Sequence, residues 1–192
     1  MFKRIIVLAT LAASISATPL LVADEANTAA ALAAESAAYC TATINKDRPT
    51  PPSVVVDKVN QACALLAKEG PAAFPKFSGK DSPFIYEGTY IAVIGLNDDL
   101  VLVHPIQYKF VGTKMTTLKD VHGKRIFVIF ESVAREKGEG WVEYYWPKPG
   151  TGESVHKISF VKKCTMANGV DVVLVSGLYN FSDADAAKLE LN

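Results

Sequence analysis

Apolar positions in the first half of the chain recur at helical spacing. The stretch from Thr28 to Lys46 is rich in alanine, a strong helix former, and the proline-rich run from Pro49 to Pro52 must end this helix because proline lacks the backbone donor. A second helix is expected to begin after Ser53, a plausible N-cap, and to end at Gly70. Its apolar residues lie three or four positions apart, at Val55, Val59, Ala62, Cys63 and Leu66.

Beyond Pro83 the pattern changes to short apolar runs that are rich in β-branched and aromatic residues. These runs cover Tyr90 to Leu96, Leu100 to His104, Trp141 to Trp146, His156 to Cys164 and Val170 to Leu178. Turn residues such as Asn, Asp, Gly and Pro separate them, which is typical of hairpins. The sequence therefore predicts about five strands in one mostly antiparallel sheet, and an α+β fold class.

Two further segments are expected to be helical. Ile126 to Phe130 suits a strand by propensity, but the apolar spacing that continues to Ala134 favours a helix ending at Gly138. The stretch from Ser182 to Leu191 has a capping serine, early aspartates and good helix formers, and predicts a short terminal helix.

The N-terminus has the pattern of a secretory signal peptide. Lys3 and Arg4 precede an apolar run from Ile5 to Ala13, and small residues come next, before Asp24. The alternative is an uncleaved membrane anchor, although the apolar run is short for a span and Pro19 interrupts its continuation. We predict a periplasmic protein, anchored to the membrane only if the leader stays uncut.

These boundaries predict the organisation of the whole chain. A signal peptide over residues 1–23 precedes an N-terminal helical segment over 24–52 and a single domain over 53–192. The 20 Lys and Arg residues balance the 20 Asp and Glu residues without a concentrated basic face, which argues against nucleic-acid binding.

Catalytic and metal-binding motifs are absent from the sequence. It contains no nucleophile elbow, phosphate-binding loop, zinc-protease motif or dinucleotide fingerprint. Its three histidines are scattered, without the spacing of a metal site. We therefore predict no enzyme activity, no metal and no cofactor.

Three cysteines, Cys40, Cys63 and Cys164, remain after export, which favours one disulfide in an oxidising compartment. All three pairings are open. If the first two helices fold back at the proline-rich turn, Cys40 and Cys63 lie at similar distances from that turn and can face each other. We therefore prefer the Cys40–Cys63 pairing.

Several phrases in the second half are more specific than a hydrophobic pattern. They are DLVLVHP (99–105), VG (111–112), LKDVHGK (118–124), KGEGWV (137–142), YWPKPG (145–150), KISFVK (157–162) and SGLY (176–179). In this order and at these spacings they resemble the single Cache domain, an extracytoplasmic ligand-sensing module of bacterial receptors. The resemblance runs from about Val55 to Tyr179.

The resemblance implies a PAS-like fold, in which an N-terminal helix packs along the sheet and a pocket on the other side takes a small ligand. Members of the family often bind small organic acids or related metabolites. Because the sequence shows no second membrane span and no output domain, we expect this chain to act through a membrane-protein partner. The alternative is an envelope interaction protein, or a subunit with a vestigial pocket.

Six residues are candidates for the ligand site. Strand alternation places Tyr144 and Trp146 on one face of their strand, where they either line a pocket or belong to the core. Lys148, Lys157 and the planar fork of Arg125 are candidate partners for a carboxylate, against the alternative that each is a solvated charge. His104, at a strand end, either donates to a ligand or is a hydrogen-bonded strand terminus.

Overall fold

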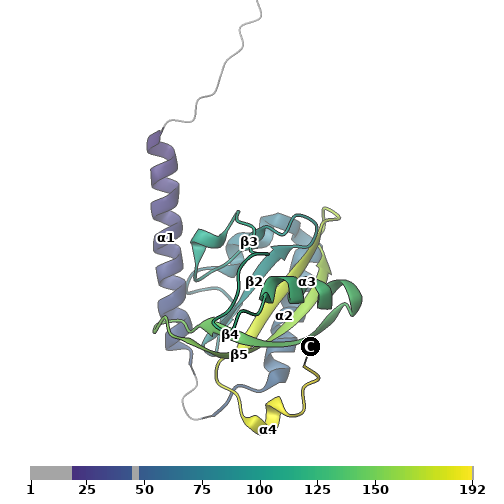
Figure 1. The fold of residues 1–192 in the computed structure, drawn as a ribbon. Coiled ribbons are helices and arrows are strands. Elements are labelled where there is room, and N and C mark those ends of the chain that lie inside the picture. Colours follow the sequence, from purple (N-terminus) through teal and green to yellow (C-terminus); the bar gives the residue numbers. More distant parts are fainter. Residues whose placement is uncertain (1–18, 45–47, 192) are drawn as a thin grey trace, which may run out of the picture.

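The computed structural model describes residues 19–44 and 48–191 (Figure 1). Residues 1–18 of the predicted signal peptide lie outside this part of the chain. Helix α1 (Pro19–Ala42) begins before the boundary that the sequence predicts at residue 24. Of the helices in the described ranges, none is long and apolar enough to cross a lipid bilayer.

The second helix, α2 (Pro52–Glu69), forms where the apolar spacing predicts it. Its N-cap residue is Pro51 rather than Ser53, so the predicted cap is wrong. Proline suits the first helical position, Pro52, because its fixed φ is helical and the missing N–H would have no partner there. The chain then continues into the 3-10 helix η1 (Gly70–Phe77).

The strands form one antiparallel sheet with the order β1-β2-β6-β5-β4, and β3 also pairs with β2. The sequence thus predicted the fold class and the pairing direction correctly, with one short strand missed. The strands are β1 (Ile85–Tyr86), β2 (Thr89–Gly95), β3 (Val101–Val103), β4 (Glu139–Pro147), β5 (Ser154–Thr165) and β6 (Asp171–Leu178).

Helices cover both faces of the sheet (Figure 1). On one face, residues of α2 such as Leu66 share a core cluster with Trp141 and Phe160 of the sheet. On the other face, α3 (Ile126–Glu136) packs over Val142 and Tyr144, which belong to a second cluster. The predicted alternation along β4, and the helical assignment of the segment after residue 125, are therefore confirmed.

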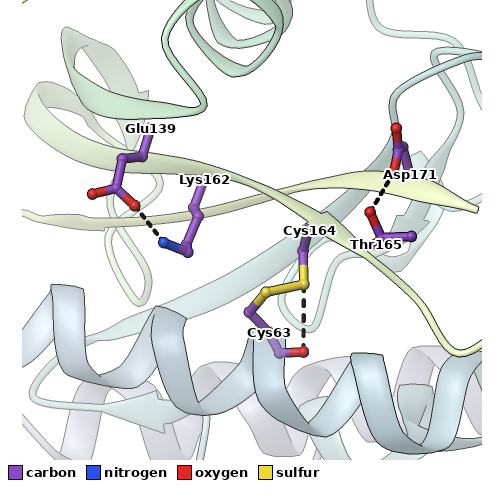
Figure 2. The surroundings of a disulfide bond; sticks show 6 residues. All are labelled: Cys63, Glu139, Lys162, Cys164, Thr165 and Asp171. Atoms are coloured by element: carbon purple, nitrogen blue, oxygen red, sulfur yellow. Dashed lines mark hydrogen bonds and ion pairs between the residues drawn. A yellow bond between two sulfur atoms is a disulfide. The ribbon is translucent and has the colours of Figure 1, made fainter.

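The disulfide differs from the prediction. Cys63 on α2 is bonded to Cys164 on β5, with an S–S distance of 2.02 Å (Figure 2), so the predicted Cys40–Cys63 pairing is wrong. The reason is that α1 does not fold back along α2 but packs beside β1, where the buried Cys40 contacts Ile85 and Tyr90. Helix α2 instead crosses the sheet, which brings Cys63 over β5.

The C-terminal helix is shorter than expected. Helix α4 spans only Asp183–Ala186, and the Ser182 hydroxyl caps it by accepting a hydrogen bond from the Asp185 backbone N–H. The chain then turns toward the free edge of the sheet, where Leu191 forms a parallel bridge with Trp141 of β4. The sequence pattern had assigned Leu191 to the terminal helix, but in the structure this residue pairs with the sheet.

Candidate ligand-binding site

A cavity of about 20 Å³ lies between the sheet and α3. A cavity of this volume holds about one water molecule. Its apolar wall comes from α3, through Phe127 and Phe130, and from Val175 of β6. Its polar lining groups are those of Tyr90, His104, Tyr144, Trp146 and Lys157.

Lys157 brings a charged side chain into this apolar interior. It lies on β5 directly opposite Tyr144 of β4, and only 2% of its surface is exposed. Its Nζ donates a hydrogen bond to the Tyr179 hydroxyl at 3.1 Å and lies 4.6 Å and 4.3 Å from the ring centroids of Tyr90 and Tyr179. Among the side chains that the structure describes, no carboxylate forms an ion pair with Lys157.

The protonation of this amine depends on its surroundings. Burial lowers the pKa of Lys157 to about 7. Burial also raises the pKa of Cys40 to about 12, so that the thiol is neutral near pH 7 and supplies no counter-charge. Lys157 is therefore a buried cation, or a neutral amine, that lacks an anionic partner.

The polar groups of the aromatic residues that line the cavity have hydrogen-bond partners within the protein. Trp146 Nε1 donates to the Tyr90 hydroxyl at 3.1 Å, and the hydroxyls of Tyr144 and Ser159 are 2.9 Å apart. Gly177 on the neighbouring strand makes room for this pair, because a Cβ there would lie 2.0 Å from Ser159 Oγ. These contacts fix the rings, and the Lys157 ammonium, with three N–H donors and a hydrogen bond to the Tyr179 hydroxyl, keeps donors that they do not use.

His104 is a neutral donor at the end of β3. Its Nδ1 accepts a hydrogen bond from the Gln107 backbone N–H at 3.0 Å, which assigns the ring proton to Nε2. Burial, together with the smaller effect of the Lys157 charge, lowers the pKa of His104 to about 3. The ring centroid lies 5.1 Å from that of Tyr90, and His104 is 6% exposed.

Four of the six predicted site residues thus line one cavity, namely His104, Tyr144, Trp146 and Lys157. The other two do not line it. Lys148 lies in the turn after β4, where its backbone N–H donates to the Glu153 carbonyl oxygen. The exposed Arg125 guanidinium donates to the Thr116 carbonyl oxygen at 3.2 and 3.3 Å.

Sequence reasoning missed Tyr90 and the two phenylalanines of α3. Tyr90 carries a hydroxyl within a strand that is buried along its whole length, and this polar tip on a large ring was the available signal. The phenylalanines gave no such signal, because an apolar helix face reads the same whether it fills a core or lines a cavity. In the described part of the chain, no group of three or more His, Cys, Asp or Glu residues is placed to hold a metal ion.

Comparisons with known proteins agree with this architecture. Residues 79–190 match the family model described as Single Cache domain 2. A solved structure described as the periplasmic sensor domain of a chemotaxis protein is 30% identical, covers 66% of this chain and 93% of its own, and superposes with a TM-score of 0.54.

Two chemotaxis proteins provide further comparisons. The solved structure of a methyl-accepting chemotaxis protein from Vibrio parahaemolyticus RIMD 2210633 is 16% identical, with a TM-score of 0.52 over 70% of this chain and 88% of that one. The methyl-accepting chemotaxis protein McpP of Pseudomonas putida KT2440 is 32% identical over 62 residues. That match covers 32% of this chain and spans 11% of the length of McpP.

Proposed function

Because this chain belongs to the single Cache domain family, we propose that it is an extracytoplasmic sensor domain that binds a small carboxylate between the sheet and α3. The observation that carries the proposal is the buried Lys157 amine, which has no carboxylate partner among the described side chains. The role proposed is binding rather than catalysis.

A ligand carboxylate would supply the anionic partner that Lys157 lacks among the described side chains. An unpaired charge away from water is costly, and pairing with an anion offsets much of that cost. The Nε2–H of the neutral His104 is a second donor in the lining of the same cavity. The apolar part of such a ligand would meet the apolar lining, which includes Phe127 and Phe130.

The volume of the cavity limits the size of the ligand. A space of about 20 Å³ accommodates one water molecule, so a ligand must displace that volume of water and move side chains of the wall. Short-chain monocarboxylates require the smallest movement. The same small volume favours the second candidate function, an interaction protein with a vestigial pocket, and a ligand-binding experiment separates the two.

The cellular location of this chain is proposed from the proteins that it is similar to. One relative is a periplasmic sensor domain, and two are methyl-accepting chemotaxis proteins. We propose that this chain is exported by its N-terminal signal peptide to the periplasm and presents its bound state to a membrane-protein partner. The mass of the protein isolated from the whole cell envelope tests this proposal, because a leader over residues 1–23 that stays intact supports a membrane anchor and contradicts release into the periplasm.

Thermal unfolding with acetate, propionate and the neutral acetamide tests ligand binding. At about a hundred times its Kd, a bound acid stabilises the fold by about 2.7 kcal/mol. We expect acetate or propionate to raise the melting temperature and acetamide to leave it unchanged. Lys157→Met should abolish the response, while Lys148→Met, which removes an equal charge outside the cavity, should preserve it.

The outcomes separate the candidate functions. A wild-type protein that responds to neither acid supports the vestigial-pocket alternative and contradicts the proposal. A response that survives Lys157→Met places the site elsewhere. Because removing a buried charge can itself stabilise a fold, each variant is compared with its own ligand-free melting temperature.

A further inference from the structure

The surroundings of Lys157 suit covalent chemistry as well as ion pairing. Its Nζ lies in the wall of a cavity, between two tyrosine rings and within 3.1 Å of a hydroxyl. We propose that the Lys157 amine captures small carbonyl compounds as a reversible imine inside this cavity. The inference rests on the proposed function only in that it requires the cavity to admit small molecules.

An amine must be unprotonated to attack a carbonyl carbon. Lysines that form imines in proteins acquire this property by burial in apolar surroundings. The groups around Lys157 are the Cys40 thiol, the imidazole of His104 and the phenols of Tyr90, Tyr144 and Tyr179. All are neutral near pH 7, and burial leaves the pKa of Lys157 at about 7, so that about half of the amine is unprotonated.

Neighbouring groups orient the reaction. Tyr179 accepts one N–H of the amine, and its own hydroxyl donates to the Pro147 carbonyl oxygen at 3.2 Å, which holds the acceptor in place. The Nε2–H of the neutral His104 is available to donate to a carbonyl oxygen in the cavity. A neutral imidazole in this role polarises a carbonyl without charging the site.

The chemistry needs no partner beyond the carbonyl compound. The nitrogen lone pair forms a bond to the carbonyl carbon, and the carbonyl π electrons move to the oxygen, which takes a proton from the nitrogen. The C–O bond then breaks, the nitrogen lone pair completes the C=N bond, and the oxygen leaves as water with the second N–H proton. The released water must leave the cavity for the imine to persist, since the cavity has space for about one water molecule.

Reductive trapping with propanal tests this inference. Propanal has no carboxylate, so its capture does not depend on the ion pair of the proposed function. With cyanoborohydride near neutral pH, we expect one N-propyl group on Lys157, formed at least about tenfold faster than on any surface lysine because of the lowered pKa. Peptide mapping locates the adduct, and Lys148 in the same protein is the internal reference.

Three variants sharpen the test. Lys157→Arg keeps a cation but cannot form an imine, so this variant should lose the adduct. The control variant Lys148→Arg should retain the adduct on Lys157. Tyr179→Phe keeps the amine and removes its hydroxyl partner, and it should slow trapping several-fold. Acetate, if it occupies the cavity, should protect Lys157 from propanal.

The outcomes distinguish the two proposals. Acetate binding without selective trapping overturns the imine and leaves the proposed function standing. Selective trapping without acetate binding supports the imine and overturns the carboxylate site. Labelling spread evenly over the surface lysines of the wild-type protein contradicts the imine, whatever the variants do.

Discussion

Lys157 illustrates how one polar residue in an apolar strand changes the chemistry of an interior. On its face of β5 it precedes Ser159 and Val161, both fully buried, and the rings of Tyr90 and Tyr179 take the place of water around its amine. Such rings attract a cation but carry no net charge. The balance of burial against this attraction gives the amine a pKa of about 7, so its charge responds to pH near neutrality.

The affinity for a carboxylate is therefore expected to depend on pH. Below about pH 7, Lys157 is already charged in the free protein, so the affinity for acetate does not change with pH. Above about pH 7, the amine must take up a proton when acetate binds, so the affinity falls about tenfold per pH unit. Calorimetry of acetate binding in buffers of different ionisation enthalpy should detect proton uptake above pH 7. Lys148→Met should keep this profile, and an affinity that is flat to about pH 9 contradicts the assignment.

The lowered pKa of Lys157 also affects the stability of the ligand-free protein. Because the pKa of Lys157 is lower in the folded chain than its ordinary value of 10.5, the unfolded chain binds more protons between about pH 7 and 10.5. This residue thus adds stability as the pH rises through that window. The corresponding rise in the free energy of unfolding should be smaller in Lys157→Met than in the wild-type protein.

At the scale of elements, local periodicity explains why so much of the sheet could be predicted. The period-two pattern of β4 alone separates Trp141 from Tyr144, and the structure places these residues in different core clusters. The helical spacing after residue 125 likewise outweighed the strand propensity of its residues. Where one face of a helix or strand is buried, the spacing of apolar residues in the sequence indicates which face it is.

Features set by the path of the chain between elements could not be predicted. Continued alternation would place Lys148 on the same face as Trp146, but β4 ends at Pro147 and Lys148 lies in the hairpin turn that leads to β5. Arg125 precedes α3 and turns toward a nearby carbonyl group instead of the cavity. The disulfide depended on how α2 crosses the sheet, which no local spacing encodes.

The Cys63–Cys164 bond is expected to contribute strongly to stability. It joins α2 to β5 across 101 positions of sequence, and closing a loop of that length restricts the unfolded chain by about 4–5 kcal/mol in the entropic model. Replacing both cysteines with serine should lower the free energy of unfolding in urea by about 2–4 kcal/mol.

The third cysteine provides the matched control. Cys40→Ser should leave the Cys63–Cys164 cross-linked peptide intact in non-reducing digests. An alkylating reagent should modify Cys40 of the wild-type protein only after unfolding, because its side chain is fully buried. A digest containing a cross-link to Cys40 would contradict the observed pairing.

At the scale of the whole molecule, α1 connects the outside of the domain to the ligand cavity. Its first turns extend past the rest of the fold (Figure 1), while its C-terminal half is anchored. Ser36 Oγ accepts a hydrogen bond from the Gly79 N–H at 2.8 Å, and Thr43 Oγ1 accepts one from the Gly88 N–H at 3.1 Å. Cys40 packs against Tyr90, whose other contacts include Trp146 and Lys157.

The helix therefore packs against a residue that lines the cavity, Tyr90, although it precedes the residues that match the family model. A chain that begins at Arg48 would expose Ile85 and Tyr90, and we expect it to lose at least about 3 kcal/mol of stability, since each buried apolar side chain contributes roughly 1.5–3 kcal/mol. It should also lose the thermal response to acetate, because Tyr90 no longer holds Trp146 and Lys157 in place. A chain that begins at Ala26 keeps Ser36, Cys40 and Thr43 with their contacts to the domain and should retain both properties, as measured by urea unfolding and thermal shift. If the shorter chain binds acetate as tightly as the longer one, α1 does not support the cavity and contributes only to stability.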